Sequence, residues 1–282
     1  MVSILKRRGY NLPFIMGIVN VTPDSFFDGG AFAAPENAIR HGLNLVAQGA
    51  DILDIGGEST RPDAKPVTPQ QEMDRVLPVI EGLRDCGKIL SIDTRHARTM
   101  REAIKAGAGM VNDVSALQHE NESLGSVAKG DFPVCLMHMQ GTPQTMQQNP
   151  QYNDVVRDIV SFFQDRMAAC EKAGLSKDRI VIDPGIGFGK TLQHNLLILR
   201  NIKEFGVLGV PVLLGLSRKS FIEKIMAQTP VVQRLPGSLA GALWAMAQGV
   251  DILRVHDVAE TKQALTVYQA INSPVQSCFS DA

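Results

Sequence analysis

The chain has 282 residues, of which 44% are apolar and 20% charged, and its 28 basic and 29 acidic side chains leave a formal net charge of -1. This balance argues against nucleic acid or a membrane surface as a partner, because both select strongly basic segments. No apolar run reaches the length of about 18 residues that a membrane-spanning helix needs. The four cysteines are scattered singly, which fits a reducing compartment, and we expect a cytoplasmic protein.

Eight short apolar runs recur along the chain, each four to seven residues long and rich in Ile, Val and Leu. Such runs are typical of strands that are buried on both faces of a parallel sheet. The predicted strands cover residues 14–20, 52–56, 89–93, 110–113, 134–138, 180–183, 212–215 and 252–256.

Between several of these runs, apolar residues recur at intervals of three and four, which predicts amphipathic helices. Such stretches include residues 38–48, 69–84, 97–105, 155–172 and 261–270. Gly49, Gly107, Gly174 and Gly249 follow predicted helix ends, where a residue that tolerates positive φ is favoured.

The alternation of strand and helix predicts an α/β fold of right-handed β-α-β units. Eight units account for a (β/α)8 TIM barrel, formed by a single domain over residues 1–282 with a barrel core at about 14–272. A doubly wound open sheet is the structural alternative, since it also alternates strands and helices.

In such a barrel the ligand site lies where the strands end, and the predicted strand ends carry unusual residues. Turn-forming residues also mark strand exits, but that explanation fits poorly with several aspartates and an arginine in apolar runs, because a buried charge needs a partner or a ligand. These polar residues are Asn20, Asp54, Asp93, Asn112, His138, Asp183, Arg254 and His256.

Side chains alternate along a strand, so Arg254 and His256 face the same side and can converge on an anion. An ion pair between Arg254 and a buried aspartate is the alternative. The segment Ser217–Ser220 leads towards a helix, which predicts Lys219 and Ser220 at the first turn, where anionic or electron-rich ligands are favoured. A solvated loop is the alternative there.

The glycine-rich segment 183–191 matches neither the phosphate-loop pattern nor the dinucleotide-binding pattern. It instead predicts a hinged loop that holds Phe188 beside Asp183 as a flat surface for an aromatic ligand, with core packing as the alternative. Two further loops, 20–30 and 56–62, have the glycines and prolines of lids that exclude water, a composition that plain turns share.

Together these motifs resemble those of the dihydropteroate synthase family, and the resemblance spans essentially the whole barrel. It is carried by Met16–Phe26, Asp54–Pro62, Ser91–Thr94, Asn112–Asp113, Leu136–Gly141, Asp183–Gly185 with Gly187–Lys190, Ser217–Ser220 and Arg254–Asp257. The resemblance implies a TIM-barrel transferase of folate biosynthesis. Such an enzyme joins p-aminobenzoate to 6-hydroxymethyl-7,8-dihydropterin diphosphate and releases diphosphate and 7,8-dihydropteroate.

The resemblance also implies roles for individual residues. The pterin would be bound by Asp93, Asn112, Met137, Asp183 and Lys219, and the diphosphate by Arg254, His256 and Asn20, the last through the cofactor Mg2+. The p-aminobenzoate end would be shaped by Phe26, Thr60, Arg61, Pro62, Phe188 and Ser220. Asp28, Lys219, Arg254 and His256 would take part in catalysis, with Asp28 stabilising a cation or accepting the amine proton.

Three positions depart from the family pattern, namely Phe27, Asp63 and Ile186, and all lie on loops. A homodimer is a further implication of the resemblance. Two other functions remain open at this point: a pterin-binding module that transfers a methyl group, and an inactive pterin-binding paralogue. Retention of Lys219 and Arg254 and the absence of a cobalamin-binding extension favour the synthase.

Overall fold

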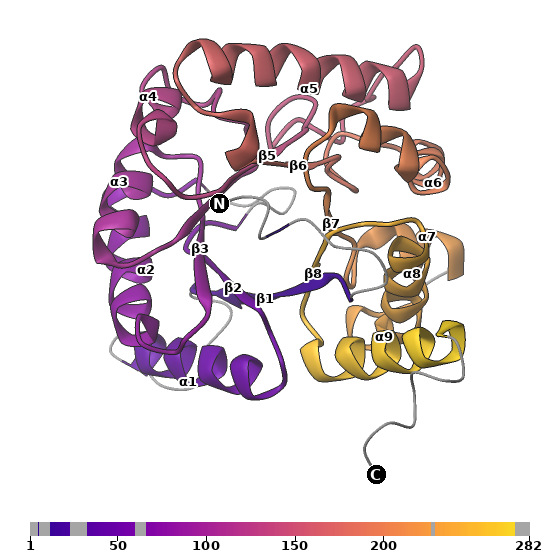
Figure 1. Ribbon diagram of the computed structural model, residues 1–282, viewed down its shortest axis with the longest axis horizontal. Helices are drawn as coiled ribbons and strands as arrows, with labels where there is room; N and C mark the ends of the chain where they lie inside the picture. Colours follow the sequence, from indigo (N-terminus) through magenta and orange to yellow (C-terminus); the bar gives the residue numbers. More distant parts are fainter. Residues whose placement is uncertain (1–4, 6–11, 23–32, 60–65, 227–228, 274–282) are drawn as a thin grey trace.

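Each of the eight predicted apolar runs contains a strand in the computed structural model of the chain, which describes residues 5, 12–22, 33–59, 66–226 and 229–273 (Figure 1). The boundaries agree with the sequence prediction to within one residue. The strands are β1 (Phe14–Asn20), β2 (Ile52–Gly56), β3 (Ile89–Asp93), β4 (Met110–Asp113), β5 (Val134–Met137), β6 (Ile180–Asp183), β7 (Leu213–Gly215) and β8 (Ile252–Val255).

All strand pairs are parallel, and the sheet has the order β6-β5-β4-β3-β2-β1-β8-β7. The two edge strands, β6 and β7, are joined by a single parallel bridge between Ile182 and Val212, supported by a 3.0 Å bond from the Ile182 amide to the Pro211 carbonyl. The sheet therefore closes nearly completely, which confirms the predicted (β/α)8 barrel and excludes the open doubly wound sheet.

Helices surround the barrel on its outside (Figure 1). The α-helices are α1 (Ala33–Ala47), α2 (Pro69–Leu83), α3 (Ala97–Ala106), α4 (Ser123–Ala128), α5 (Val155–Lys172), α6 (Leu192–Arg200), α7 (Ser220–Met226), α8 (Leu235–Ala247) and α9 (Val258–Asn272), and the 3-10 helices are η3 (Lys177–Arg179), η4 (Ile202–Leu208) and η5 (Val231–Gln233). The helices predicted at 38–48 and 261–270 are longer than expected, and the one at 155–172 has the predicted bounds.

Local signals account for several helix ends. Thr68 and Gln71 form a reciprocal capping box at the start of α2, and Asp154 accepts hydrogen bonds from two amides at the start of α5. The four glycines predicted to follow helix ends all have positive φ, between 86° at Gly249 and 123° at Gly107.

The interior of the barrel is apolar at the amino ends of the strands. Alternate residues point inward, and one layer of them forms a separate cluster together with Leu5. Besides Leu5, this cluster contains Met16, Ile52, Met110, Cys135, Val181, Leu213 and Ile252. The strand residues between them pack outward against the helices in the main core. Within the described ranges, no helix has both the length and the apolar character that crossing a membrane requires.

Candidate functional site

The inward-facing side of the strands becomes polar towards their carboxyl ends. Residues two and four positions after the apolar layer also point into the barrel, and they lie nearer the carboxyl ends of the strands. The positions reached on β1 to β6 include Asn20, Asp54, Asp93, Asn112, Met137 and Asp183, and those reached on and just after β8 are Arg254 and His256. In the sheet register Asn112 lies opposite Asp93, and Met137 lies opposite Asp183. The predicted pterin-binding residues of these strands thus share one rim.

Arg254 forms the centre of a partly buried ionic network in this rim. Its Nε atom donates to Asp54 Oδ2 at 2.6 Å, and its Nη2 atom donates to Asp93 Oδ2 at 2.8 Å. The Asn112 amide also donates to Asp54 Oδ2, at 3.1 Å. The ion-pair alternative for Arg254 is therefore present, with two aspartates, and Asp54 is a site residue to which the sequence reasoning gave no role.

The charges of this network shift one another's titration. Burial, followed by the nearby charge of Asp54, raises the pKa of Asp93 to about 7, against the opposing effect of Arg254. Burial alone would lower the pKa of Arg254, but Asp54 and Asp93 together hold it above its usual range. Arg254 therefore stays charged, whereas Asp93 can change protonation near neutral pH.

Asp183, Lys219 and Phe188 form the opposite part of the rim. Asp183 Oδ1 accepts a 2.7 Å bond from the Gly185 amide, and burial raises the pKa of this carboxyl while Lys219 opposes the rise. Lys219 Nζ donates to the Ile186 carbonyl and lies 4.7 Å from the centre of the Phe188 ring. Burial lowers the pKa of Lys219 to about 8, and Asp183 is the main opposing charge. Lys219 immediately precedes α7, which begins at Ser220.

The glycines of the β6–α6 loop are required by close contact with the β5–α5 loop. A Cβ atom at Gly185, where φ is 70°, would lie 2.0 Å from the His138 carbonyl oxygen. At Gly189, where φ is 61°, a Cβ atom would lie 2.5 Å from the Gln140 carbonyl oxygen. Neither position can accept a side chain, so these glycines set the position of Phe188 between them.

Lys190 joins the same two loops and is a second residue to which the sequence reasoning gave no role. It is only 1% exposed, and its Nζ atom lies 3.0 Å from His138 Nδ1, 3.3 Å from the His138 carbonyl and 2.8 Å from the Phe188 carbonyl. Burial lowers the pKa of Lys190 to about 7, and burial together with Lys190 lowers the pKa of His138 to about 3. The sequence feature that could have identified Lys190 is its position directly after three glycines at alternate positions.

The remaining predicted residues are placed as follows. His256 Nδ1 lies 3.1 Å from the Ser217 hydroxyl, Asn20 is half-buried at the end of β1, and Ser220 is exposed at the start of α7. Phe26, Asp28, Thr60, Arg61 and Pro62, together with Phe27 and Asp63, lie outside the described residues.

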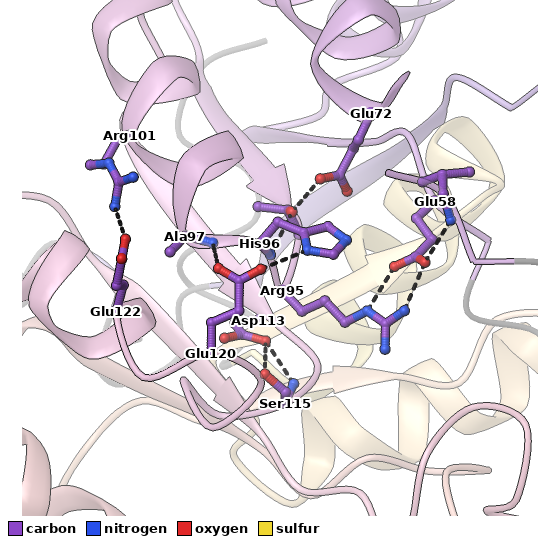
Figure 2. Close-up of polar contacts among 12 residues, drawn as sticks. Glu58, Glu72, Arg95, His96, Ala97, Arg101, Asp113, Ser115, Glu120 and Glu122 are labelled. Carbon is purple, nitrogen blue, oxygen red and sulfur yellow. Dashed lines mark hydrogen bonds and ion pairs between the residues drawn. The ribbon is translucent and has the colours of Figure 1, made fainter. Parts of the chain in front are cut away.

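A second ionic cluster borders the rim beyond β2 and β3 (Figure 2). Arg95 donates through Nε and Nη2 to the two carboxylate oxygens of Glu58, at 2.9 and 2.8 Å. The Val67 amide donates to Glu58 Oε1 at 3.3 Å. The Glu58 carboxylate, 7% exposed, thus ties the residues before and after segment 60–65 to the β3–α3 loop. Such bidentate pairs fix geometry as well as charge.

The donor chemistry of the rim is compatible with Mg2+. This ion prefers oxygen ligands and keeps few protein contacts when substrate phosphates complete its shell. Asn20, half-buried at the end of β1, offers an amide oxygen at the rim.

Comparison with known proteins gives a consistent result over nearly the whole chain. The profile of the family described as pterin binding enzyme matches residues 16–256. The dihydropteroate synthase of Haemophilus influenzae is 49% identical over 268 residues, which cover 94% of this chain and 96% of that protein.

Two solved structures of Xanthomonas albilineans dihydropteroate synthase are similar in fold. One contains 4-aminobenzoic acid and has a TM-score of 0.88 at 48% identity, covering 94% of this chain and 95% of that one. The other contains 7,8-dihydropteroate and has a TM-score of 0.85 at 46% identity, covering 95% and 97%.

Proposed function

The chain belongs to the pterin-binding enzyme family and, within it, to the dihydropteroate synthases, and from this membership and the geometry of the rim we propose its chemistry. It is a transferase that joins p-aminobenzoate to 6-hydroxymethyl-7,8-dihydropterin diphosphate, forming 7,8-dihydropteroate and diphosphate.

One observation carries the assignment of the pterin site: two carboxyl groups, an amide and an ammonium group from four different strand ends face one interior. A pterin edge presents alternating donors and acceptors, which Asp93, Asn112 and Asp183 match from fixed strand positions. Met137, opposite Asp183 in the register, is placed to pack on the ring, and Lys219 donates from the other side.

Arg254 and His256 are assigned to the diphosphate. Arg254 lies on the inward-facing side of β8 and His256 directly follows this strand, and Arg254 is held charged by two carboxylates. As the C–O bond to the diphosphate breaks, they spread the charge of the leaving group. Mg2+, which Asn20 would help to hold, supplies further neutralisation of phosphate charge when bound.

The amine nitrogen of p-aminobenzoate then attacks the methylene carbon, which the electron-rich dihydropterin stabilises as a cation. A C–N bond forms and the amine loses one proton, for which Asp28 is the proposed acceptor. Phe188, beside the Lys219 ammonium, and Ser220 shape the p-aminobenzoate end together with Phe26, Thr60, Arg61 and Pro62.

A homodimer and a cytoplasmic location complete the proposal, both on the basis of family membership. The dimer is also supported by exposed apolar side chains around α7 and η5, including Met226 at 63% and Val232 at 78% exposure. Light scattering from the purified protein tests it.

The deciding experiment incubates the purified protein with the pterin diphosphate, Mg2+ and p-aminobenzoate and detects dihydropteroate by mass. We expect diphosphate release that depends on p-aminobenzoate. A methyl-transferring module or an inactive paralogue would show no such dependence, and that result would refute the proposed function.

A further inference from the structure

Three potential metal ligands come together outside the pterin rim, where the β3–α3 and β4–α4 loops meet. One ligand atom from each of His96, His119 and Glu120 lies within 4.8 Å of the other two. The His96 Nδ1 atom is 3.0 Å from Glu120 Oε1, and the two imidazole rings meet edge to face with centroids 5.2 Å apart. Ligand atoms that share one zinc ion each lie about 2.0 to 2.2 Å from it, so the wider of these separations must shorten when an ion binds.

The cluster is held in place by the surrounding chain. The second carboxylate oxygen of Glu120 accepts a 3.0 Å bond from the Ala97 amide at the start of α3, which fixes the direction of the first (Figure 2). His96 is 7% exposed, whereas His119 lies at the surface. A metal ion can therefore enter from solvent on the His119 side and reach two ligands that are already oriented.

His96 is incompletely satisfied as it stands. Its Nε2 atom is buried and has no hydrogen-bond partner among the residues that the structure describes, and the same holds for Glu72 Oε1. The Thr94 hydroxyl connects these two residues, since it donates to Glu72 Oε2 at 2.7 Å and accepts from the His96 amide at 3.1 Å. Metal-binding histidines commonly direct their second ring nitrogen at a carboxylate, and Glu72, which Thr94 joins to the His96 backbone, is the carboxylate that we assign to this role.

The geometry points to a divalent transition-metal site formed by His96, His119 and Glu120, with Zn2+ as the ion that this ligand set fits best. Two imidazoles and a carboxylate are typical of three-ligand zinc sites with an open fourth position. Mg2+ disfavours imidazole, so this site differs in chemistry from the Mg2+ site of the proposed function. Zinc here cross-links the two loops that follow the strands of Asp93 and Asn112.

The test uses full-length protein without a histidine tag, stripped with a chelator and titrated with ZnCl2 in calorimetry in the presence of excess Mg2+. We expect one zinc ion per chain and at least a tenfold weaker affinity in His119→Ala and Glu120→Gln. His119 is exposed, and glutamine retains the oxygen that accepts from Ala97, so both variants should keep the fold.

The matched control is His194→Gln, which removes a histidine elsewhere while keeping a residue that suits its capping box. It should bind zinc like the unmodified chain. Co2+ provides a second probe, because its visible absorption should change when His119 is removed. Equal zinc affinity in the unmodified chain and His119→Ala, or no binding by the unmodified chain, would overturn the site without affecting the proposed function.

Discussion

The buried ammonium of Lys190 gives the sharpest quantitative prediction, and Lys190→Met tests it. Methionine has a similar length and fills the same space, but it cannot carry a proton. The variant leaves the His138 and Phe188 carbonyls without their donor, which destabilises the protein. It also removes the free-energy cost of burying the charged ammonium group, which stabilises the folded protein. These effects oppose each other at any single pH, so the diagnostic quantity is how the free energy of unfolding changes with pH.

The sign follows from proton binding in the two states. Between the pKa of about 7 in the folded protein and the ordinary value of 10.5 in the unfolded chain, the unfolded chain binds more protons at Lys190, so stability rises with pH. Below about pH 7, Lys190 is protonated in both the folded and the unfolded state. The penalty, which is the free-energy cost of burying its charge, then no longer changes with pH. With these pKa values, the penalty is about 4 kcal/mol at pH 7 and about 2 kcal/mol at pH 9.

Urea titrations of both proteins at pH 7 and pH 9 measure this difference. From pH 7 to pH 9, the unmodified chain should gain about 2 kcal/mol more unfolding free energy than Lys190→Met does. Lys129→Met, at an exposed lysine, is the control and should follow the unmodified chain. Parallel pH profiles for the unmodified chain and Lys190→Met would refute the reasoning, because they would mean that Lys190 titrates normally.

Three further predictions concern the ionic networks of the rim. Asp54→Ala should lower the free energy of unfolding by about 3 kcal/mol or more, because it leaves Arg254 with one carboxylate, and a loss below about 1 kcal/mol in urea titration would contradict this. Arg95→Met removes the ion pair that anchors Glu58 to the β3–α3 loop. Because Glu58 closely precedes Thr60, Arg61 and Pro62, which are assigned to p-aminobenzoate, the variant should raise the KM for p-aminobenzoate more than the KM for the pterin diphosphate. Equal changes of the two KM values in steady-state kinetics would count against this reasoning. The affinity for the pterin should increase about tenfold from pH 6 to pH 8, as Asp93 with its pKa of about 7 becomes ionised, and a flat binding profile by calorimetry would exclude that carboxylate as the recognising form.

The strands were predictable because parallel strands buried on both faces leave a strong pattern of consecutive apolar residues. Their ends depend on individual hydrogen bonds, which the pattern does not contain. Val212 directs its amide to the Asp251 carboxylate at 2.8 Å and forms only an isolated bridge, so β7 starts one residue later than predicted. Helix α8 was not identified because its sequence, LPGSLAGALWAMA, has no charged face and therefore no amphipathic period.

For the site, the period of two identified the shared face of Arg254 and His256, but the same count from Ile52 also reaches Asp54. The sequence could place Asp54 inside the barrel, yet it could not choose its partner. Arg254 contacts Asp54 and Asp93, which are 200 and 161 residues away in the sequence. Which interior residues lie at the same level along the barrel axis depends on the tilt and stagger of the strands in the closed sheet. Contacts across the barrel therefore needed the structure.

The position of Asp93 suggests how the two halves of the pterin substrate are coupled in the proposed function. Its carboxylate pairs with Arg254 and also borders the space assigned to the pterin. Asp54 pairs with Arg254 as well, but it is fully buried and is not assigned to the pterin. In the proposed function, a pterin N–H that donates to Asp93 would compete with Arg254 for this carboxylate, while Asp54 would still hold the guanidinium in place. Weaker pairing with Asp93 would strengthen the attraction of Arg254 for an anion. Because one substrate molecule carries both the pterin and the diphosphate, recognition of the ring then favours binding of the leaving group.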